Sequence, residues 1–187
     1  MPPIPKITKD MILNTVLTIT QETGFETVNA RSIAHRLQCS TRPIFTCYEN
    51  MEELKKEFLD FAFTYYTQYV EKYDKSALLK PYLLLPLSYI DFAKQEPFLF
   101  KLLFISDMDL DMKKASDFYT EIGNEEKAKI FSTMIGIEQH RAKDIFLDLF
   151  LYAHGMAVLT ATGKLSFDHA TTEKMLYNFL SALRSAK

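Results

Sequence analysis

The sequence predicts an all-α protein with about nine helices. Apolar residues recur every three or four positions along most of the chain, which is the spacing of a helix face. Val, Ile and Thr never gather into the alternating runs that indicate strands. All seven prolines lie at or before position 97, so long uninterrupted helices are permitted from Phe98 onward.

The composition is that of a globular protein. Of its 187 residues, 48% are hydrophobic and 25% are charged, which is enough apolar material for a substantial core. The length fits one large domain, or a small domain joined to a medium one. The start, MPPIPK, lacks the apolar run of a signal peptide, and no apolar stretch reaches the roughly 18 to 20 residues that span a bilayer. We therefore expect a cytoplasmic protein with no membrane partner.

Two helices and a tight turn are expected at the beginning of the chain. Apolar residues form one stripe over residues 8–23, and Gly24 is a suitable residue to end that helix. A shorter helix covers residues 30–37 and buries its own apolar side. Gln38 and Cys39 then form the turn to the next element.

Capping residues predict where the next two helices begin. Ser40 is a good N-cap for a third short helix, and Pro43 is tolerated in a first helical turn. Asn50 and Glu53 have the spacing of a capping box at the start of a fourth helix. The apolar stripe of this fourth helix consists of Leu54, Phe58, Phe61, Tyr65 and Tyr69.

The composition changes between Tyr73 and Ala77, where we place a domain boundary. The expected parts are a domain over residues 1–50, a connecting helix over 51–75 and a second domain over 76–187. The second domain is expected to contain a helix that Pro81 and Pro86 start or kink and that ends near Gln95, a helix beginning at Pro97, a helix between loops within 106–126, and long helices over 139–162 and 167–186.

Two short helices joined by a tight turn, the second of them polar and basic, are typical of a helix-turn-helix. Such a second helix can enter the major groove of DNA, where side chains of its N-terminal half reach base edges. Arg42 could hold a guanine through its two acceptors, and Arg31 could reach the same groove or a phosphate. No acidic residue occurs from Thr27 to Tyr48, which avoids repulsion by the DNA backbone. From spacing alone, a solvated basic hairpin is the alternative.

The stretch GFETVNARSIAHRLQCSTRPIFTCYENMEEL resembles the DNA-binding signature of the tetracycline-repressor (TetR/AcrR) family. Gly24 and Phe25 match its glycine-aromatic step. Ile33 and Ala34 match its Ile-Ala pair, and Ser40 its helix-capping position. The resemblance implies that operator DNA is contacted by Arg31, Ser40, Thr41, Arg42, Pro43, Phe45, Thr46 and Cys47.

Two positions depart from the family pattern. Phe45 stands where the family usually has a phosphate-binding tyrosine, and Met51 where it usually has a phosphate-binding lysine. The resemblance therefore implies fewer contacts to the DNA backbone, unless Lys55 or Lys56 supplies them.

The later sequence resembles the regulatory domain of the same family. SYIDFAKQEPFLFKLLF is similar to a common helix pair of these domains, and FLYAHGMAVL to their dimer-forming penultimate helix. The resemblance implies a ligand-responsive domain and a homodimer through the last two helices. Independently of it, alanines repeat at a spacing of four and would let another helix approach closely, within the chain or across a dimer axis. The interface candidates are Ala153, Ala157, Ala161, Phe179 and Leu183.

Aromatic residues of the second domain could line an apolar ligand cavity, although most belong in an ordinary core. The candidates to bind a largely apolar small-molecule effector are Tyr89, Phe92, Phe104, His140, Phe150 and His154. The four histidines and two cysteines lack convergent metal-ligand spacing, so we expect no metal and no other cofactor. Cys39 and Cys47 could form a redox pair, but such thiols more often simply pack.

No GxSxG, HExxH, phosphate-loop or dinucleotide motif occurs, so catalysis is not expected. The sequence therefore predicts an N-terminal helix-turn-helix DNA-binding domain followed by a helical ligand-binding and dimerisation domain, which together act as a repressor that an effector releases. A non-enzymatic apolar-ligand protein with a vestigial helix-turn-helix is the alternative, motivated by Phe45 and Met51. A helical enzyme that uses His140 or His154 is a second one.

Overall fold

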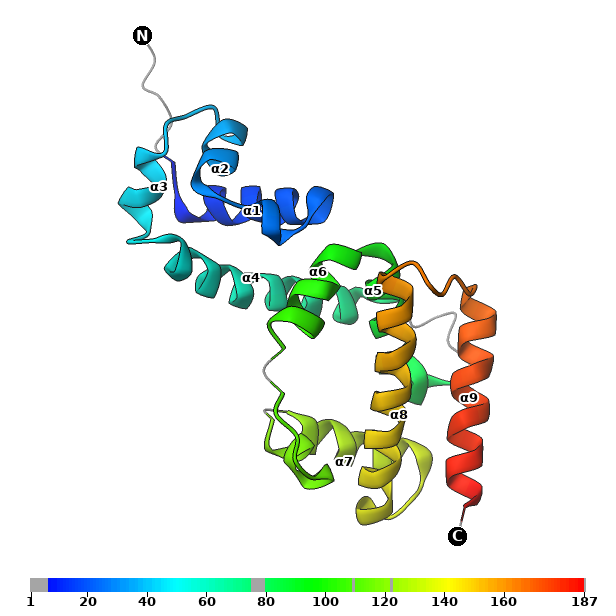
Figure 1. Ribbon diagram of the computed structural model, residues 1–187. Coiled ribbons are helices and arrows are strands. Elements are labelled where there is room, and N and C mark those ends of the chain that lie inside the picture. Colours follow the sequence, from blue (N-terminus) through cyan, green and yellow to red (C-terminus); the bar gives the residue numbers. More distant parts are fainter. Residues whose placement is uncertain (1–6, 75–79, 109, 122, 187) are drawn as a thin grey trace. The chain divides into compact units, whose positions relative to one another are not determined.

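The computed structural model describes residues 7–74, 80–108, 110–121 and 123–186, and over these residues the protein is all-helical. The described residues form two compact units (Figure 1). Unit 1 comprises Met1–Gln68 and Glu96–Asp107, and unit 2 comprises Tyr69–Gln95 and Met108–Lys187. The predicted fold class is thus confirmed, and the domain boundary expected near residues 73–77 falls largely outside the described residues.

Unit 1 has a core made by the first four helices and α6. Its elements are α1 (Lys9–Thr23), a 3₁₀ turn (Phe25–Thr27), α2 (Ala30–Arg36), α3 (Arg42–Cys47), most of α4 (Met51–Lys72), α6 (Pro97–Lys101) and a π-helical turn (Leu102–Ser106). The expected apolar stripes face inward, since Ile12, Ile33 and Leu54 are completely buried. Helix α6 packs directly on α1.

A polar cluster fixes the beginning of α6 within unit 1. Glu96, the N-cap residue of α6, accepts hydrogen bonds from Gln21 of α1 at 2.8 Å and from the Tyr65 hydroxyl of α4 at 2.9 Å. Burial and the neighbouring Glu96 carboxylate raise the pKa of Tyr65, which keeps the phenol protonated as a donor. Three helices far apart in sequence are thereby joined at one carboxylate.

Unit 2 is built around α8. Its elements are a 3₁₀ turn (Pro81–Leu83), α5 (Leu84–Gln95), a second 3₁₀ segment (Ala115–Thr120), α7 (Asn124–Ile135), α8 (Gln139–Ala161) and α9 (His169–Ser185). Helix α8 packs against α5, α7 and α9 (Figure 1). At one end of this unit Arg141 donates to the carbonyl of Arg184 at 2.8 Å, and Arg184 donates to the carbonyl of Ile135 at 3.1 Å. These bonds satisfy carbonyl groups that helix ends otherwise leave unpaired.

Helix starts differ from the sequence predictions at two places. Helix α3 begins at Arg42 with Thr41 as its N-cap residue, and no side chain caps it, so the prediction that Ser40 is the N-cap was wrong. The single helix predicted within residues 106–126 is a 3₁₀ segment instead, and α7 begins just before that range ends. Gly123 adopts a left-handed conformation with φ 85° and separates these two elements.

Helix α8 is more apolar than the sequence reading allowed. Among the described helices it alone is long and apolar enough, by length and composition, to cross a membrane. Many of its apolar residues are buried in unit 2, including Ile145, Leu149 and Met156. Packing as the central helix of a folded unit accounts for the apolar residues on its buried side.

Candidate nucleic-acid interface

The turn between α2 and α3 is a helix C-terminal motif that closes on itself. The Cys39 amide donates to the carbonyl of Ala34 at 3.0 Å, and the Gln38 amide donates to that of His35 at 3.2 Å. This is the double hydrogen-bond pattern of a Schellman motif, whose central residue is left-handed. Gln38 occupies that position with φ 52°, where glycine is usual. The turn therefore fixes how α3 leaves α2.

The start of α2 is held by a capping box that the sequence reading missed. The Asn29 side chain accepts from the Ser32 amide at 3.0 Å, and the Ser32 hydroxyl accepts from the Asn29 amide at 2.9 Å. Asn followed three residues later by Ser is not the usual Ser/Thr-x-x-Glu signature, which explains why the pattern gave no signal. The box places Arg31, in the first turn of α2, on the solvent-exposed side.

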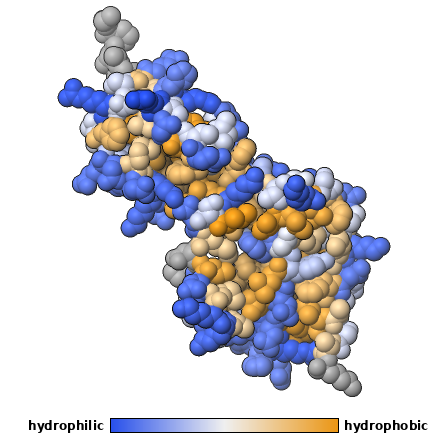
Figure 2. Space-filling view, in the orientation of Figure 1, coloured by the Kyte–Doolittle hydropathy of each residue, from blue (hydrophilic) through white to orange (hydrophobic). Residues whose placement is uncertain are grey.

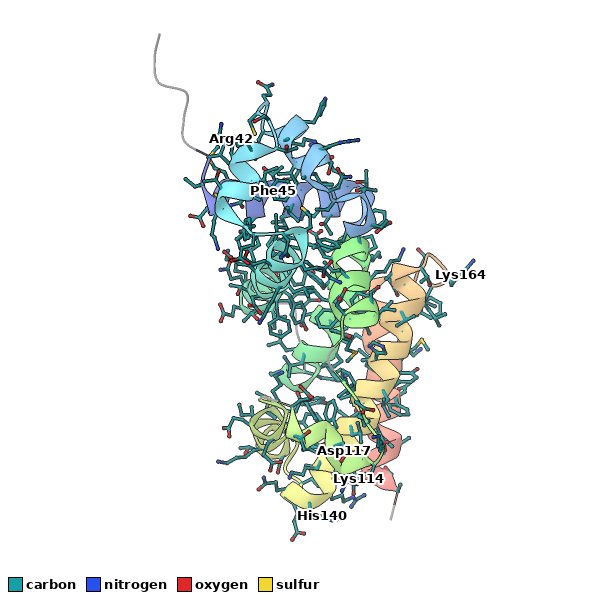
Figure 3. The ribbon with its side chains drawn as sticks, turned by 60° about the vertical axis from the view of Figure 1, so that its left-hand side comes forward. Arg42, Phe45, Lys114, Asp117, His140 and Lys164 are labelled. Carbon is teal, nitrogen blue, oxygen red and sulfur yellow. The ribbon has the colours of Figure 1, made fainter. Side chains whose placement is uncertain are left out.

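Helix α3 has one buried and one exposed side. Ile44 is fully buried and Tyr48, just after the helix, is 2% exposed, so both belong to the core of unit 1. Arg42, Phe45 and Thr46 are exposed at the i, i+3 and i+4 spacing of one helix face. Figure 3 shows Arg42 and Phe45 on this short helix. The Thr46 hydroxyl donates to the Arg42 carbonyl at 3.0 Å and is thus engaged by its own helix.

The remaining predicted DNA-contacting residues lie on the same segment. Ser40 is exposed, whereas Thr41, Pro43 and Cys47 are half-buried. Cys39 is also half-buried, and both cysteines are free thiols. The structure therefore brings the predicted residues together on α2, the turn and α3.

Several cations near the helix-turn-helix are engaged by carboxylates of unit 1. Arg36 pairs with Glu22, and this hydrogen bond raises the pKa of the guanidinium and lowers that of the carboxyl group. Lys55 pairs with Asp107 at 2.6 Å, so it is not a free substitute for the phosphate anchor that Met51 lacks. Arg31, Arg42 and Lys56 form no ion pair with any described residue and are the cations left for a polyanion. Lys9 is also paired, since its Nζ lies 2.6 Å from Oε2 of Glu57.

Acidic and basic side chains are unevenly distributed along residues 7–68. Residues 7–68 contain six basic and eight acidic side chains, yet residues 27–48 contain Arg31, Arg36 and Arg42 and no acidic residue. The helix-turn-helix is therefore the part of residues 7–68 most favourable to a polyanion.

In unit 2, three of the six predicted ligand-binding residues form one cluster. The Tyr89 hydroxyl and His154 Nδ1 are 2.9 Å apart, and the Phe150 ring lies 5.8 Å from the imidazole. Phe118, which the sequence reading did not select as a site residue, lies 4.8 Å from Phe150. Burial lowers the pKa of His154, so the neutral imidazole is favoured. The cluster is an apolar environment with one polar pair.

The other three predicted ligand-binding residues lie elsewhere. Phe92 is fully buried and its ring lies 5.2 Å from that of Tyr69. Phe104 belongs to unit 1, where its ring lies 4.9 Å from that of Tyr66. His140 is exposed at the beginning of α8 (Figure 3). Helical spacing alone could not distinguish these positions from the cluster around Tyr89.

The exposed apolar face of α8 is not the face that carries the alanine row. Ala153, Ala157 and Ala161 are buried within unit 2, where α8 packs against other helices. Leu151 and Leu159 are 51% and 47% exposed and lie on either side of the exposed Gly155. Figure 2 shows apolar side chains on the visible surface of both units.

A groove of about 350 Å³ lies over this face of α8, the connection that follows it and α9. Its lining is Leu151, Tyr152, Gly155, Met156, Leu159, Leu165, Phe167 and Met175. Phe179, predicted at a dimer interface, stacks on Tyr152 within the chain at a ring distance of 4.3 Å. Leu183 is half-buried. The groove and the two exposed leucines form a continuous apolar surface.

Comparison with solved structures identifies the arrangement. The chain superposes on a TetR-like transcriptional regulator from Rhodococcus sp. RHA1 with a TM-score of 0.63 and 12% sequence identity, over 99% of this chain and 100% of that chain. The chain has a TetR-like fold. The fold part of the resemblance inferred from the helix-turn-helix sequence is thus confirmed. No protein-family model matches the sequence, and no curated protein matches it either. Within the described residues of this TetR-like fold, no group of three or more His, Cys, Asp or Glu side chains gathers as metal ligands.

Proposed function

We propose that the protein is a sequence-specific DNA-binding transcriptional regulator. The observation that carries this proposal is the exposed face of α3, which presents Arg42 from a segment without carboxylates, within a TetR-like fold. A guanidinium so placed matches the two acceptors of guanine in the major groove. Arg31 at the start of α2 adds a second unpaired cation on the same segment.

Homodimerisation is part of the proposal. The apolar surface of α8 and α9 around Leu151, Gly155 and Leu159 supports it, because large exposed apolar surfaces mark association sites. A two-fold axis through this surface would pair two recognition helices on a near-palindromic site, with half-sites roughly 34 to 36 Å apart. The partner surface is therefore the exposed leucine face rather than the alanine row.

A small, largely apolar effector completes the proposal. The Tyr89–His154 pair beside Phe118 and Phe150 supplies one polar anchor among aromatic rings. Release of DNA would follow as a population shift, in which the effector prefers a dimer with wrongly spaced recognition helices by a few kcal/mol. We also propose that this repressor is cytoplasmic and has no catalytic activity.

A second candidate function is supported by the charge balance of unit 1. Residues 7–68 are net acidic, and both Phe45 and Met51 lack a phosphate-binding group. These features favour a non-enzymatic apolar-ligand protein whose helix-turn-helix no longer binds DNA. The two candidates differ in one measurable property, which is salt-dependent binding to duplex DNA.

The deciding experiment selects duplexes from a random library with the full-length protein at low salt. We expect enrichment of a near-palindrome, and Arg42→Ala to lower discrimination at one base pair per half-site by about 1–3 kcal/mol. Arg36→Ala is the matched control. Because the Arg36 side chain already pairs with Glu22, we expect this substitution to change the affinity for all sequences alike. Absence of any duplex binding at low salt would leave the ligand-binding candidate instead.

A further inference from the structure

The most exposed apolar side chain of the helix-turn-helix is that of Phe45. It exposes 49% of its surface, while its neighbour Ile44 is completely buried. Phe45 lies one turn from Arg42 on the exposed face of α3 (Figure 3). Single exposed apolar side chains are common on protein surfaces, so what distinguishes this ring is its place beside Arg42 on the face proposed to enter DNA.

The chemistry of the ring limits what that partner can be. A phenyl group has no hydrogen-bond donor, so it cannot anchor a phosphate oxygen as a tyrosine hydroxyl can. Base edges in the major groove offer one apolar group, the 5-methyl of thymine, and phenylalanine is among the side chains that contact it. Burying the ring against that methyl removes apolar surface of both partners from water.

The charges around Phe45 favour DNA over an apolar protein surface as the partner of the exposed face of α3. Arg31 and Arg42 form no ion pair with any described residue, and no carboxylate occurs in the sequence from Thr27 to Tyr48. The hydroxyl of the adjacent Thr46 is bonded to its own helix, so it does not compete as the donor beside the ring. A ring flanked by cations matches a groove that combines a polyanionic backbone with apolar methyl groups.

We propose that Phe45 reads a thymine in each half-site through the thymine 5-methyl group. The proposal rests on the proposed DNA-binding function and deepens it. The operator would then carry a guanine contacted by Arg42 and, within the reach of one helical turn, a thymine contacted by Phe45. The phenyl ring at this position would thus contact a base, where the family tyrosine contacts a phosphate.

The test replaces single thymines by deoxyuracil, which removes only the methyl group, in the duplex selected with the full-length protein. Binding is measured for the wild type, for Phe45→Ala and for Phe63→Ala, a control ring on α4 that is 52% exposed. We expect one replacement to lower wild-type affinity about fourfold per half-site, and about 15-fold when both half-sites are changed. Phe63→Ala should keep this sensitivity, and Phe45→Ala should lose it.

Two contrary results have different meanings. If wild type and Phe45→Ala respond identically to every uracil replacement, or if Phe45→Ala weakens all sequences equally, the methyl-reading role is wrong while sequence-specific binding stands. If neither protein binds any duplex at low salt, although both are folded by circular dichroism, the DNA-binding function itself fails and the inference falls with it.

Discussion

At the scale of single residues, the Tyr89–His154 pair is the polar element of the aromatic cluster in unit 2. The Tyr89 hydroxyl and His154 Nδ1 are 2.9 Å apart, and the imidazole centroid lies 6.1 Å from the Tyr89 ring and 5.8 Å from the Phe150 ring. Burial disfavours the charged imidazolium, which lowers the pKa of His154 below its ordinary value of 6.5. A neutral histidine held in this way makes the stability of the unit depend on pH.

The sign of that dependence follows from proton binding. The unfolded chain takes up a proton at His154 near pH 6.5, whereas the folded protein does so only at lower pH. The free energy of unfolding should therefore fall as the pH is lowered from about 6.5 toward 5. Urea titrations at a series of pH values measure it. His154→Gln should flatten this slope; equal slopes in wild type and His154→Gln would contradict the assignment.

At the scale of elements, the α2–α3 turn determines the direction of α3. Its hydrogen bonds need a left-handed residue, and Gln38 provides it at φ 52°. A left-handed conformation costs a non-glycine residue about 1–2 kcal/mol. The left-handed residue in this turn therefore lowers the stability of unit 1.

Relieving that strain should stabilise the protein. Gln38→Gly is expected to raise the free energy of unfolding by about 0.5–1 kcal/mol, because the gain is partly offset by the greater freedom of glycine in the unfolded chain. Gln68→Gly, at an exposed position inside α4, should instead lower it by about 1 kcal/mol. Guanidinium titrations of the two variants would contradict this account if they moved in the same direction.

The sequence predicted elements well where a local signal exists. Helices α1, α8 and α9 follow their apolar stripes, and the Asn50 side chain accepts from the Glu53 amide at 2.9 Å as expected. Ser40 failed as an N-cap because the Schellman turn extends the connection and α3 starts one residue later than predicted. At this position the N-cap preference of Ser40 competes with a turn whose hydrogen bonds cannot be predicted from the residue types.

At the scale of the whole molecule, the proposed dimer surface is open to a direct test. Leu159→Glu places a charge on the exposed leucine face of α8, where Leu159 is 47% exposed. We expect a dimer to become monomeric at micromolar concentration, since an unpaired charge in an apolar interface is strongly unfavourable. Sedimentation velocity measures the change. Met134→Glu, on α7 and 52% exposed, is the matched control and should stay dimeric; a monomeric wild type would contradict the proposed assembly.

Packing partners are what the sequence could not supply at this scale. The spacing of Ala153, Ala157 and Ala161 predicted that a helix approaches closely, but not that the approach is within the chain. Likewise, Phe104 looked like a residue of the second domain and instead packs in unit 1. Periodicity specifies which residues share a face, whereas the neighbour of that face depends on the whole fold.

The scarcity of unpaired cations on unit 1 bears on how such a regulator would search a genome. Each phosphate contact strengthens binding to every DNA sequence alike, and a genome offers millions of competing sites. With Lys9, Arg36 and Lys55 held by carboxylates, and with Phe45 and Met51 uncharged, few contacts of that kind are left. A smaller fraction of the molecules would then be sequestered on irrelevant DNA. Fewer copies per cell would suffice to keep an operator occupied.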